Sequence, residues 1–302
     1  MADKPSRGLV LYGDGLARLI GPAQTNLHGF ASRASCGFLA LHHSPPSENE
    51  ETRLIREFAE ILDSNEAYGN TDVENTHEEK LSFPTVAERF MGMKASIVTD
   101  DLSLKSFGGT LGFKVFNWNE LTRDGDLASE LLKSLGFQEG KTLETSMFDL
   151  IFVHIGAGVK MNGLKDIELV NKLVGDLLHV ALSESEVGSR LHMSVIMSYG
   201  AIVGDDDLKL SVFDNKIENG SEFSGVFPRQ SYTMKGGKPR ENVRNYCPML
   251  LAQYQSAVTR MDTVESFSYR DFFENGGNLV IPADRFLHEV AFKLWKAPKY
   301  GA

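Results

Sequence analysis

The chain has 302 residues, of which 42% are hydrophobic and 24% charged, and its formal net charge at pH 7 is −10. These values are typical of an ordinary globular protein, and we expect one domain over residues 1–302. Because phosphate groups are bound by basic surfaces, the negative charge argues against a nucleic-acid or membrane partner. Only two cysteines occur, Cys36 and Cys247, which provide neither a disulfide framework nor a CxxC metal pair.

The apolar runs of the chain are short. None reaches about 18 residues, the length that a membrane-spanning helix needs. No apolar segment of the secretory type precedes the first predicted strand. With so few cysteines, a reducing compartment is expected, and we predict the cytoplasm, with the nucleus as an alternative.

Strands and helices are predicted to alternate along the chain. Six nearly continuous apolar runs are typical of strands buried on both faces, at residues 8–12, 94–98, 113–116, 148–155, 191–198 and 248–254. Apolar residues at helical spacing predict helices near 54–62, 127–135, 167–178 and 286–294, the second ending at Gly136. This order predicts an α/β fold with a mostly parallel central sheet and helices on both faces.

Two further segments are interpreted from their composition. Residues 25–41 predict a helix that ends at Gly37 and continues into a short strand. Residues 44–84 begin with Pro45 and Pro46 and are rich in acidic residues, which predicts an acidic surface segment containing some helix.

The most informative motif is Leu-Val-Leu-Tyr-Gly-Asp-Gly at residues 9–15. It predicts a buried strand that delivers Asp14 to a tight turn between Gly13 and Gly15, where a ligand or an ion can approach the backbone closely. Ligands of open α/β sheets collect at the carboxyl ends of strands. Asp14 is therefore the first candidate for binding, and an N-cap of the next helix is the alternative role.

Other candidate residues follow predicted elements. His28 lies in the first turns of its helix, where a partly exposed structural histidine is the alternative to a ligand-binding one. His154 ends an apolar strand, which favours a hydrogen-bonded core histidine. Ser198 follows a strand in Ile-Met-Ser-Tyr-Gly, which has half of the G-x-S-x-G pattern of serine hydrolases. A basic cluster offers either an anion site or a solvated loop, and it comprises Lys235, Lys238, Arg240 and Arg244.

Acidic residues also follow predicted strands, at Asp100–Asp101 and at Asp205–Asp207. Carboxylates that meet at one sheet edge bind Mg²⁺ or Mn²⁺. Asp14 with Asp100, Asp101 and Asp205 is therefore a candidate metal site, and solvated acidic loops are the alternative.

Five segments together resemble the alkaline phosphatase superfamily, and within it the archaeal-type cofactor-independent phosphoglycerate mutases. Residues 9–15 resemble the family's first strand, which ends in a metal-binding aspartate, and Gly-Met-Lys-Ala-Ser-Ile-Val at 92–98 lies in a second similar stretch. The full set of similar segments is 9–15, 25–41, 90–116, 148–178 and 247–294. This resemblance implies an alkaline phosphatase-like core and phosphoryl transfer by a serine nucleophile at two divalent ions.

Most of the implied metal ligands have no counterpart in this sequence, although Asp14 matches. The other positions fall on Val159, Gly163, Ser198, Tyr199 and a residue near Asn242. The nucleophile segment is replaced by His42-His43-Ser44-Pro45-Pro46, and the family's large inserted domain is absent. Since a metal site needs several ligands in a defined geometry, one aspartate is not sufficient.

The sequence therefore favours a non-catalytic, pseudoenzyme form of this fold, with no cofactor. It would serve as a binding or scaffold module for an unknown protein partner or a small phosphorylated ligand. The alternative is a phosphatase or phosphomutase with a rebuilt Mg²⁺ or Mn²⁺ site and Ser44 or Ser35 as acceptor. A metal-free serine hydrolase using Ser198 is a third reading.

Overall fold

The computed structural model describes residues 6–45, 48–69, 83–121, 126–156, 163–182, 186–201, 210–211, 234–244, 246–277 and 280–298. The strands are β1 (Arg7–Gly13), β2 (Ser35–Ala40), β3 (Ala95–Val98), β4 (Lys114–Phe116), β5 (Phe137–Gln138), β6 (Lys141–Thr142), β7 (Leu150–Ile155), β8 (Leu191–Met197), β9 (Met234–Lys235), β10 (Lys238–Pro239), β11 (Met249–Tyr254) and β12 (Val280–Pro282).

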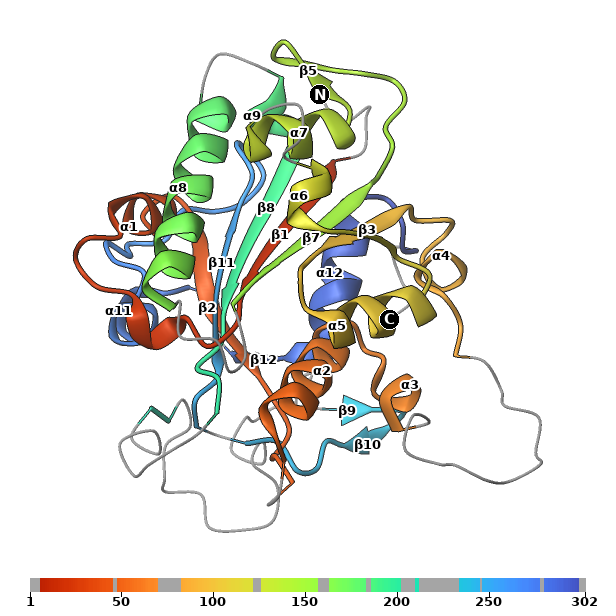
Figure 1. The fold of residues 1–302 in the computed structure, drawn as a ribbon. Coiled ribbons are helices and arrows are strands. Elements are labelled where there is room, and N and C mark those ends of the chain that lie inside the picture. Colours follow the sequence, from red (N-terminus) through yellow and green to blue (C-terminus); the bar gives the residue numbers. More distant parts are fainter. Residues whose placement is uncertain are drawn as a thin grey trace.

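The helices surround the strands (Figure 1). They are α1 (Thr25–Ala31), α2 (Glu50–Ile61), α3 (Asn65–Gly69), α4 (Val86–Arg89), α5 (Leu102–Thr110), α6 (Trp118–Leu121), α7 (Leu127–Ser134), α8 (Gly163–Leu182), α9 (Val187–Arg190), α11 (Tyr269–Asn275) and α12 (Phe286–Lys293), with 3₁₀ turns η1 (Ala17–Leu19) and η3 (Ala283–Arg285).

One eight-stranded sheet organises the molecule, in the order β12-β2-β11-β8-β1-β7-β3-β4. Strand β1 lies near its centre, parallel to both β7 and β8. Among the described strands of this sheet, only β11 runs against the others, since it is antiparallel to both of its neighbours. The predicted α/β class with a mostly parallel sheet is confirmed. Consequently the carboxyl ends of β1, β2, β3, β7 and β8 all meet at one edge.

Helices pack on both faces of this sheet (Figure 1). Leu9 and Leu11 of β1 face one core, which α1, α7, α8 and α11 cover. Val10 and Tyr12 face the second core, beneath α2, α5 and α12. This alternation is the period of two expected of a strand, and burial on both faces explains the unbroken apolar run of β1.

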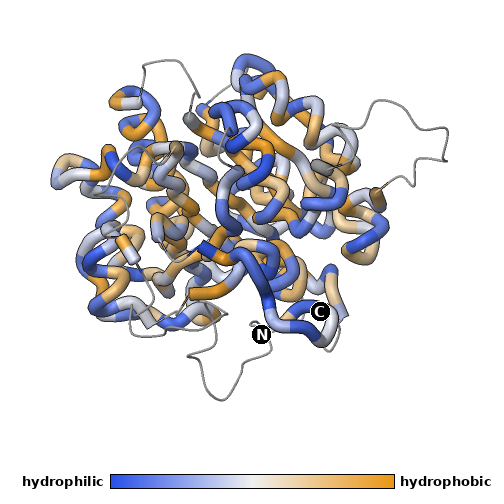
Figure 2. Tube along the Cα trace, turned by 90° about the horizontal axis from the view of Figure 1, so that it is seen from below, coloured by the Kyte–Doolittle hydropathy of each residue, from blue (hydrophilic) through white to orange (hydrophobic). Residues whose placement is uncertain are grey.

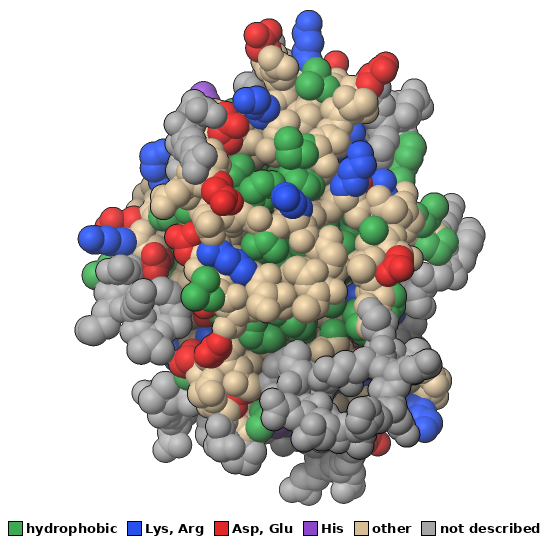
Figure 3. Space-filling model, turned by 45° about the vertical axis from the view of Figure 1, so that its right-hand side comes forward, with side chains coloured by type: hydrophobic (Ala, Val, Ile, Leu, Met, Phe, Trp, Pro, Cys, Tyr) green, Lys and Arg blue, Asp and Glu red, His purple; other side chains and the backbone are tan. Residues whose placement is uncertain are grey.

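The outer parts of the molecule are more polar. Figure 2 shows apolar segments concentrated inside and hydrophilic ones toward the rim. On the face in Figure 3, acidic and basic side chains are interspersed. Within the described ranges, no helix has the length and apolar character needed to cross a membrane.

A helix and then a strand follow Thr25, as predicted, but the predicted end of the helix at Gly37 is wrong. Helix α1 ends at Ala31, and Gly37 lies inside β2. β2 pairs with both β11 and β12, and the hydrogen bonds to these strands hold its small residues in an extended conformation. The predicted end of another helix is confirmed, because Gly136 directly follows the last turn of α7 with φ +82°.

The acidic segment 44–84 is only partly superficial. It contains α2, most of whose residues are buried, including the charged Arg53, Glu57 and Glu60. Residues 70–82 of this segment lie outside the described residues.

Candidate functional site

The turn after β1 holds Asp14 at the carboxyl edge of the sheet. The Asp14 backbone N–H donates to the Ile155 carbonyl of β7 over 2.8 Å. Gly15 has φ +70°, and its N–H donates to the Ser198 hydroxyl over 2.9 Å. A residue with this positive φ is most easily glycine. Hydrogen bonds to β7 and to the residue after β8 thus hold the turn on both sides, and they fix the position of the Asp14 backbone.

Both carboxylate oxygens of Asp14 are occupied by protein donors. Arg53 Nη2 donates to Oδ2 over 2.7 Å. The Ser198 hydroxyl donates to Oδ1 over 2.9 Å, and the Tyr12 hydroxyl does so over 3.3 Å. Burial alone would raise the pKa of Asp14, but the Arg53 guanidinium, together with His154 and the Ser198 hydrogen bond, lowers that pKa below its usual value. Asp14 is therefore an ionised carboxylate that is neutralised from within the chain.

Asp14 does not serve as the N-cap that the sequence offered as an alternative. The element after it is the short turn η1, whose cap residue is Leu16 and which has no side-chain cap hydrogen bond. The carboxylate instead points toward α2, where its oxygen meets Arg53.

Arg53 belongs to a buried network of charges along α2. Its remaining guanidinium nitrogens bind Glu50 over 2.9 Å and Glu57 over 2.8 Å. Glu57 is fully buried and also meets Arg244 over 3.4 Å. Burial raises the pKa of Glu57 even though the nearby arginines act against it. The network therefore balances its charges only when each arginine stays in place.

The network continues at the far end of α2. Arg56 binds Glu48 over 2.7 Å and Glu60 over 2.8 Å, and Glu60 also accepts from His42 over 3.1 Å. Sequence reasoning missed this network, although one signal was present. Glu50, Arg53, Glu57 and Glu60 repeat at spacings of three and four, which places opposite charges on one helical face.

The described residues do not fit the two divalent ions that the resemblance implies. Within them, no three His, Cys, Asp or Glu side chains gather closely enough to hold a metal. Arg53 presents a cation to Asp14 where a metal would have to bind. Gly163 and Tyr199 are two of the other positions where the resemblance implies a ligand. Gly163 is the first residue of α8 and has no side chain, and the Tyr199 backbone carbonyl accepts a hydrogen bond from Arg18 over 2.9 Å. Val159 and Asp205–Asp207 lie outside the described residues.

Two of the three candidate serines, Ser198 and Ser44, take part in the hydrogen bonding around this network. Ser198 is buried and uses its hydroxyl to join Asp14 to Gly15. Ser44 accepts from Arg56 Nη2 over 2.9 Å and from Arg244 Nη1 over 3.5 Å. These contacts give both hydroxyls a structural role. Their use as nucleophiles stays a prediction.

The two candidate histidines occupy different environments. His28 Nδ1 accepts from the Phe267 N–H over 3.0 Å, which leaves Nε2 to donate to the Gly21 carbonyl, also over 3.0 Å. Both nitrogens of His28 thus fasten α1 to backbone. His154 is buried and its Nδ1 meets the Thr99 hydroxyl over 2.9 Å, as expected of a core histidine. Burial lowers the pKa of His154.

The basic cluster is only partly solvated, because Lys235 and Lys238 are exposed whereas its arginines are buried in ion pairs. Arg240 meets Asp284, and Arg244 meets Glu57. Lys235 bridges Asp63 over 2.8 Å and Asp284 over 3.1 Å. Since acidic side chains of the chain already pair with these three residues, they are poorly placed to capture a separate anion.

A cleft of about 640 Å³ opens beside this site. Its described lining is acidic and includes Glu50, Glu51, Asp100, Asp101 and Asp166, with His154 also contributing. Asp101 Oδ1 accepts from the Leu104 N–H over 2.7 Å as the N-cap of α5, and Asp100 Oδ1 accepts from the Trp118 N–H over 3.2 Å. These two carboxylates therefore stabilise local backbone, and they share the cleft without forming a metal cluster.

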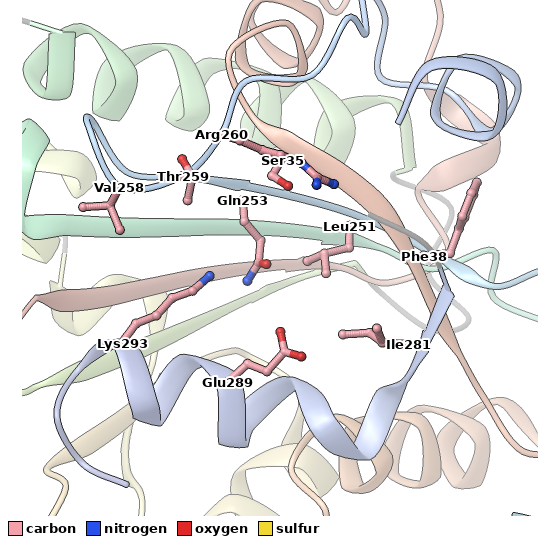
Figure 4. Close-up of a pocket in the computed structure, with 10 residues that line it drawn as sticks. All are labelled: Ser35, Phe38, Leu251, Gln253, Val258, Thr259, Arg260, Ile281, Glu289 and Lys293. Carbon is pink, nitrogen blue, oxygen red and sulfur yellow. The ribbon is translucent and has the colours of Figure 1, made fainter. Parts of the chain in front are cut away.

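A second cavity of about 290 Å³ lies between α12 and the strands β2 and β11 (Figure 4). Glu289 and Lys293 reach into it from α12, and Gln253 reaches toward them from β11 (Figure 4). Sequence reasoning did not single out any of these three residues.

Comparison with known proteins yields structural matches only. No protein-family model matches the sequence, and no curated protein matches it. The PH0037 protein from Pyrococcus horikoshii aligns over 99% of both chains at 14% identity, with a TM-score of 0.56. This likeness shows a shared fold over the whole chain.

Two other matches have TM-scores below 0.5. A protein in the alkaline phosphatase superfamily from Vibrio parahaemolyticus is 11% identical over 85% of this chain and 61% of its own, with a TM-score of 0.44. The cofactor-independent phosphoglycerate mutase from Thermoplasma acidophilum is 14% identical over 70% of this chain and 39% of its own, with a TM-score of 0.37. Structures of the superfamily that the sequence resembles are thus among the matches.

Proposed function

We propose that this chain is a non-catalytic, alkaline phosphatase-like protein that acts as a binding or scaffold module. The observation that carries the proposal is the occupation of both Asp14 oxygens by Arg53, Ser198 and Tyr12. A guanidinium and a metal ion compete for the same lone pairs. Metal binding at Asp14 would displace Arg53 and leave Glu57 buried with less compensation.

The neighbouring cleft supports the same proposal. Its described lining carries five carboxylates and includes neither lysine nor arginine. Phosphoryl transfer needs cations around the phosphate, whether metal ions or basic side chains. An acidic lining opposes a phosphorylated ligand, and between the two partners expected from the sequence it favours a protein.

The proposal is tested by metal content and activity of the full chain. Protein purified without chelators and dialysed against Zn²⁺, Mg²⁺ and Mn²⁺ in turn is analysed by mass spectrometry for bound metal. Hydrolysis of p-nitrophenyl phosphate is measured beside it, with Asp14→Asn as the matched control. We expect substoichiometric metal and equal background rates for both proteins.

Two tightly bound divalent ions per chain, with hydrolysis that Asp14→Asn abolishes, would overturn the proposal. That result would instead support the metal-dependent phosphatase or phosphomutase with a rebuilt site. Labelling of Ser198 by a fluorophosphonate reagent would support the third reading, a serine hydrolase.

A further inference from the structure

The cleft beside Asp14 has a buried floor and an exposed rim. His154 and Ile155 of β7 and Leu54 of α2 line it, and each is at most 4% exposed. Leu102 of α5 also lines it and is 77% exposed. Helices α2 and α5 lie side by side (Figure 1). The cleft therefore leads from solvent to the carboxyl edge of the central strands.

Most carboxylates of this cleft have no cation beside them among the described residues. Of the five in the described lining, Glu50 pairs with Arg53. In the part of the chain that the structure describes, the other four have no ion pair, and they are Glu51, Asp100, Asp101 and Asp166. These four are exposed or half-buried, so water solvates them. Together they give the concave surface a negative potential, which attracts cations.

A ring nitrogen of His154, at the floor of the cleft, lacks a hydrogen-bond partner. The residue is 2% exposed, and its Nδ1 meets the Thr99 hydroxyl over 2.9 Å. Nε2 is shielded from water and has no partner among the described residues. Burial lowers the pKa of His154, so the ring is neutral, and Nε2 accepts a hydrogen bond when Nδ1 donates to Thr99. Since buried polar groups are rarely left unpaired, Nε2 indicates a ligand that brings a donor into the cleft.

These groups determine the class of ligand. The carboxylates would repel an anion. A bare metal ion needs a cluster of protein ligands, and none forms among the described residues. A lysine or arginine side chain brings N–H donors for the carboxylates and for His154 Nε2. Its aliphatic stem packs on apolar side chains such as Leu54.

The rim of the cleft favours a peptide over a small free cation. Leu102 and Leu169 both line the cleft, and they are 77% and 38% exposed. The half-buried Trp118 lines it as well, and aromatic rings attract cations. Exposed apolar side chains gathered among polar ones are typical of protein-binding surfaces. Apolar residues on either side of the cation would cover this rim.

We propose that this cleft binds a basic segment of a partner protein, in which a lysine or arginine enters the cleft and apolar residues flank it. The cation would donate to His154 Nε2 at the floor, and the surrounding carboxylates would balance its charge. The flanking residues would pack on Leu102 and Leu169. This inference rests on the function proposed above, because it gives the chemistry of the protein that the binding module would hold.

The test uses the full chain and short synthetic peptides in which lysines alternate with leucines. In one matched peptide acetyl groups neutralise the lysines, and in another serines replace the leucines. Binding is measured by calorimetric titration at low and at high salt. We expect the unmodified peptide to bind about tenfold more tightly than the acetylated one, and also more tightly than the serine peptide. Its affinity should fall as the salt concentration rises.

Two pairs of variants separate the charge from the apolar contact. Asp166→Asn should weaken peptide binding by about threefold. Its control Glu168→Gln changes an exposed carboxylate on the same helix, outside the described lining, and should have no effect. Leu102→Ser should also weaken binding. Its control Leu164→Ser changes a side chain that is 71% exposed and outside the described lining, and it should leave binding unchanged.

The ring of His154 is observed directly in the unmodified chain. Heteronuclear NMR of protein with isotope-labelled histidine reports each ring nitrogen. We expect the lysine peptide to shift the Nε2 resonance of His154. His192 serves as the internal control, because it pairs with Gly8 near the other end of β1, whereas His154 pairs with Tyr12. Its resonances should stay in place.

Several results would overturn the proposal. These are the absence of peptide binding, equal binding of the acetylated peptide, unchanged affinity in both Asp166→Asn and Leu102→Ser, or binding that leaves His154 Nε2 unshifted. The metal and hydrolysis measurements remain separate. A metal-free, inactive chain that fails to bind the peptide would overturn only this inference, whereas bound metal with hydrolysis would overturn the proposed function.

Discussion

At the scale of single residues, Arg53 is the side chain on which the site depends. It is buried and touches three carboxylates, those of Asp14, Glu50 and Glu57. Removing one partner from a buried ion pair leaves an uncompensated charge, which costs far more than the pair contributes when intact. Arg53 therefore stabilises the fold at the same position where we propose that it excludes a metal.

Substituting Arg53→Met tests this dependence. Methionine keeps an apolar stem of similar shape but leaves Asp14 and Glu57 without that cation. We expect the free energy of unfolding to fall by about 3–5 kcal/mol. Urea denaturation followed by circular dichroism measures the change. The control Arg270→Met breaks an exposed pair with Glu274 and should cost about 0.5 kcal/mol or less. Similar losses in both variants would contradict a buried role for Arg53.

His192 provides a prediction about pH. Burial, and secondarily the charge of Lys293, lowers the pKa of His192 well below its usual value. The unfolded chain takes up a proton near pH 6.5, whereas the folded chain does not, so stability falls as the pH drops below about 6.5. A single such group contributes a slope of about 1.4 kcal/mol per pH unit.

The variant His192→Gln removes that titration while keeping an amide near Ser194. Its stability should depend less on pH than that of the unmodified chain between about pH 6.5 and 5. Urea denaturation at several pH values measures both slopes. Identical slopes would show that His192 is not held neutral by the fold. His154, whose pKa is also lowered, accounts for part of the remaining dependence.

At the scale of elements, the turn of β1 and the end of β7 are closely packed. Gly156 directly follows β7 with φ +137°, a backbone conformation that favours glycine. A Cβ atom on Gly156 would lie 2.5 Å from the Asp14 carbonyl oxygen and 3.0 Å from Asp14 Cβ. This close approach fixes the Asp14 turn against its neighbouring strand.

The substitution Gly156→Ala should therefore destabilise the chain. It adds backbone strain of about 1–3 kcal/mol and a contact that the backbone must shift to relieve. The control Gly109→Ala lies in α5, where a Cβ meets no atom within 4 Å. Because alanine favours helix, that control should stabilise by up to about 1 kcal/mol. Thermal unfolding of both variants measures whether each substitution raises or lowers the stability. A loss of stability in Gly109→Ala equal to that in Gly156→Ala would contradict this account.

The elements predicted correctly are those with a strong pattern. Strands β1, β7 and β8 are mostly apolar runs buried at the centre of the sheet, and α8 has a regular apolar stripe. The region of β2 was harder, because its small residues fit either a helix or a strand locally. Only pairing with β11 and β12, which are distant in sequence, decides between them.

At the scale of the whole molecule, the parallel sheet brings distant residues to one edge. Asp14 was identifiable from the sequence because its glycines mark a turn at the end of an apolar strand. Arg53 was not identified, and Arg244 was named only as part of a basic cluster, because charged residues on a helix or in a loop are usually exposed. The contact of Arg53 with Asp14 joins residues that are 39 apart in the sequence, and the contact of Arg244 with Glu57 joins residues that are 187 apart. The sequence thus located the turn but not the cation beside it.

The central claim is that Arg53, not a metal ion, neutralises Asp14. Anomalous X-ray diffraction from crystals of the full chain soaked in Mn²⁺ tests it most directly. We predict no anomalous peak within coordination distance of the Asp14 carboxylate, about 2.6 Å at most, and Arg53 Nη2 still bonded to Oδ2. A Mn²⁺ peak on the Asp14 oxygens, with Arg53 displaced, would contradict the account.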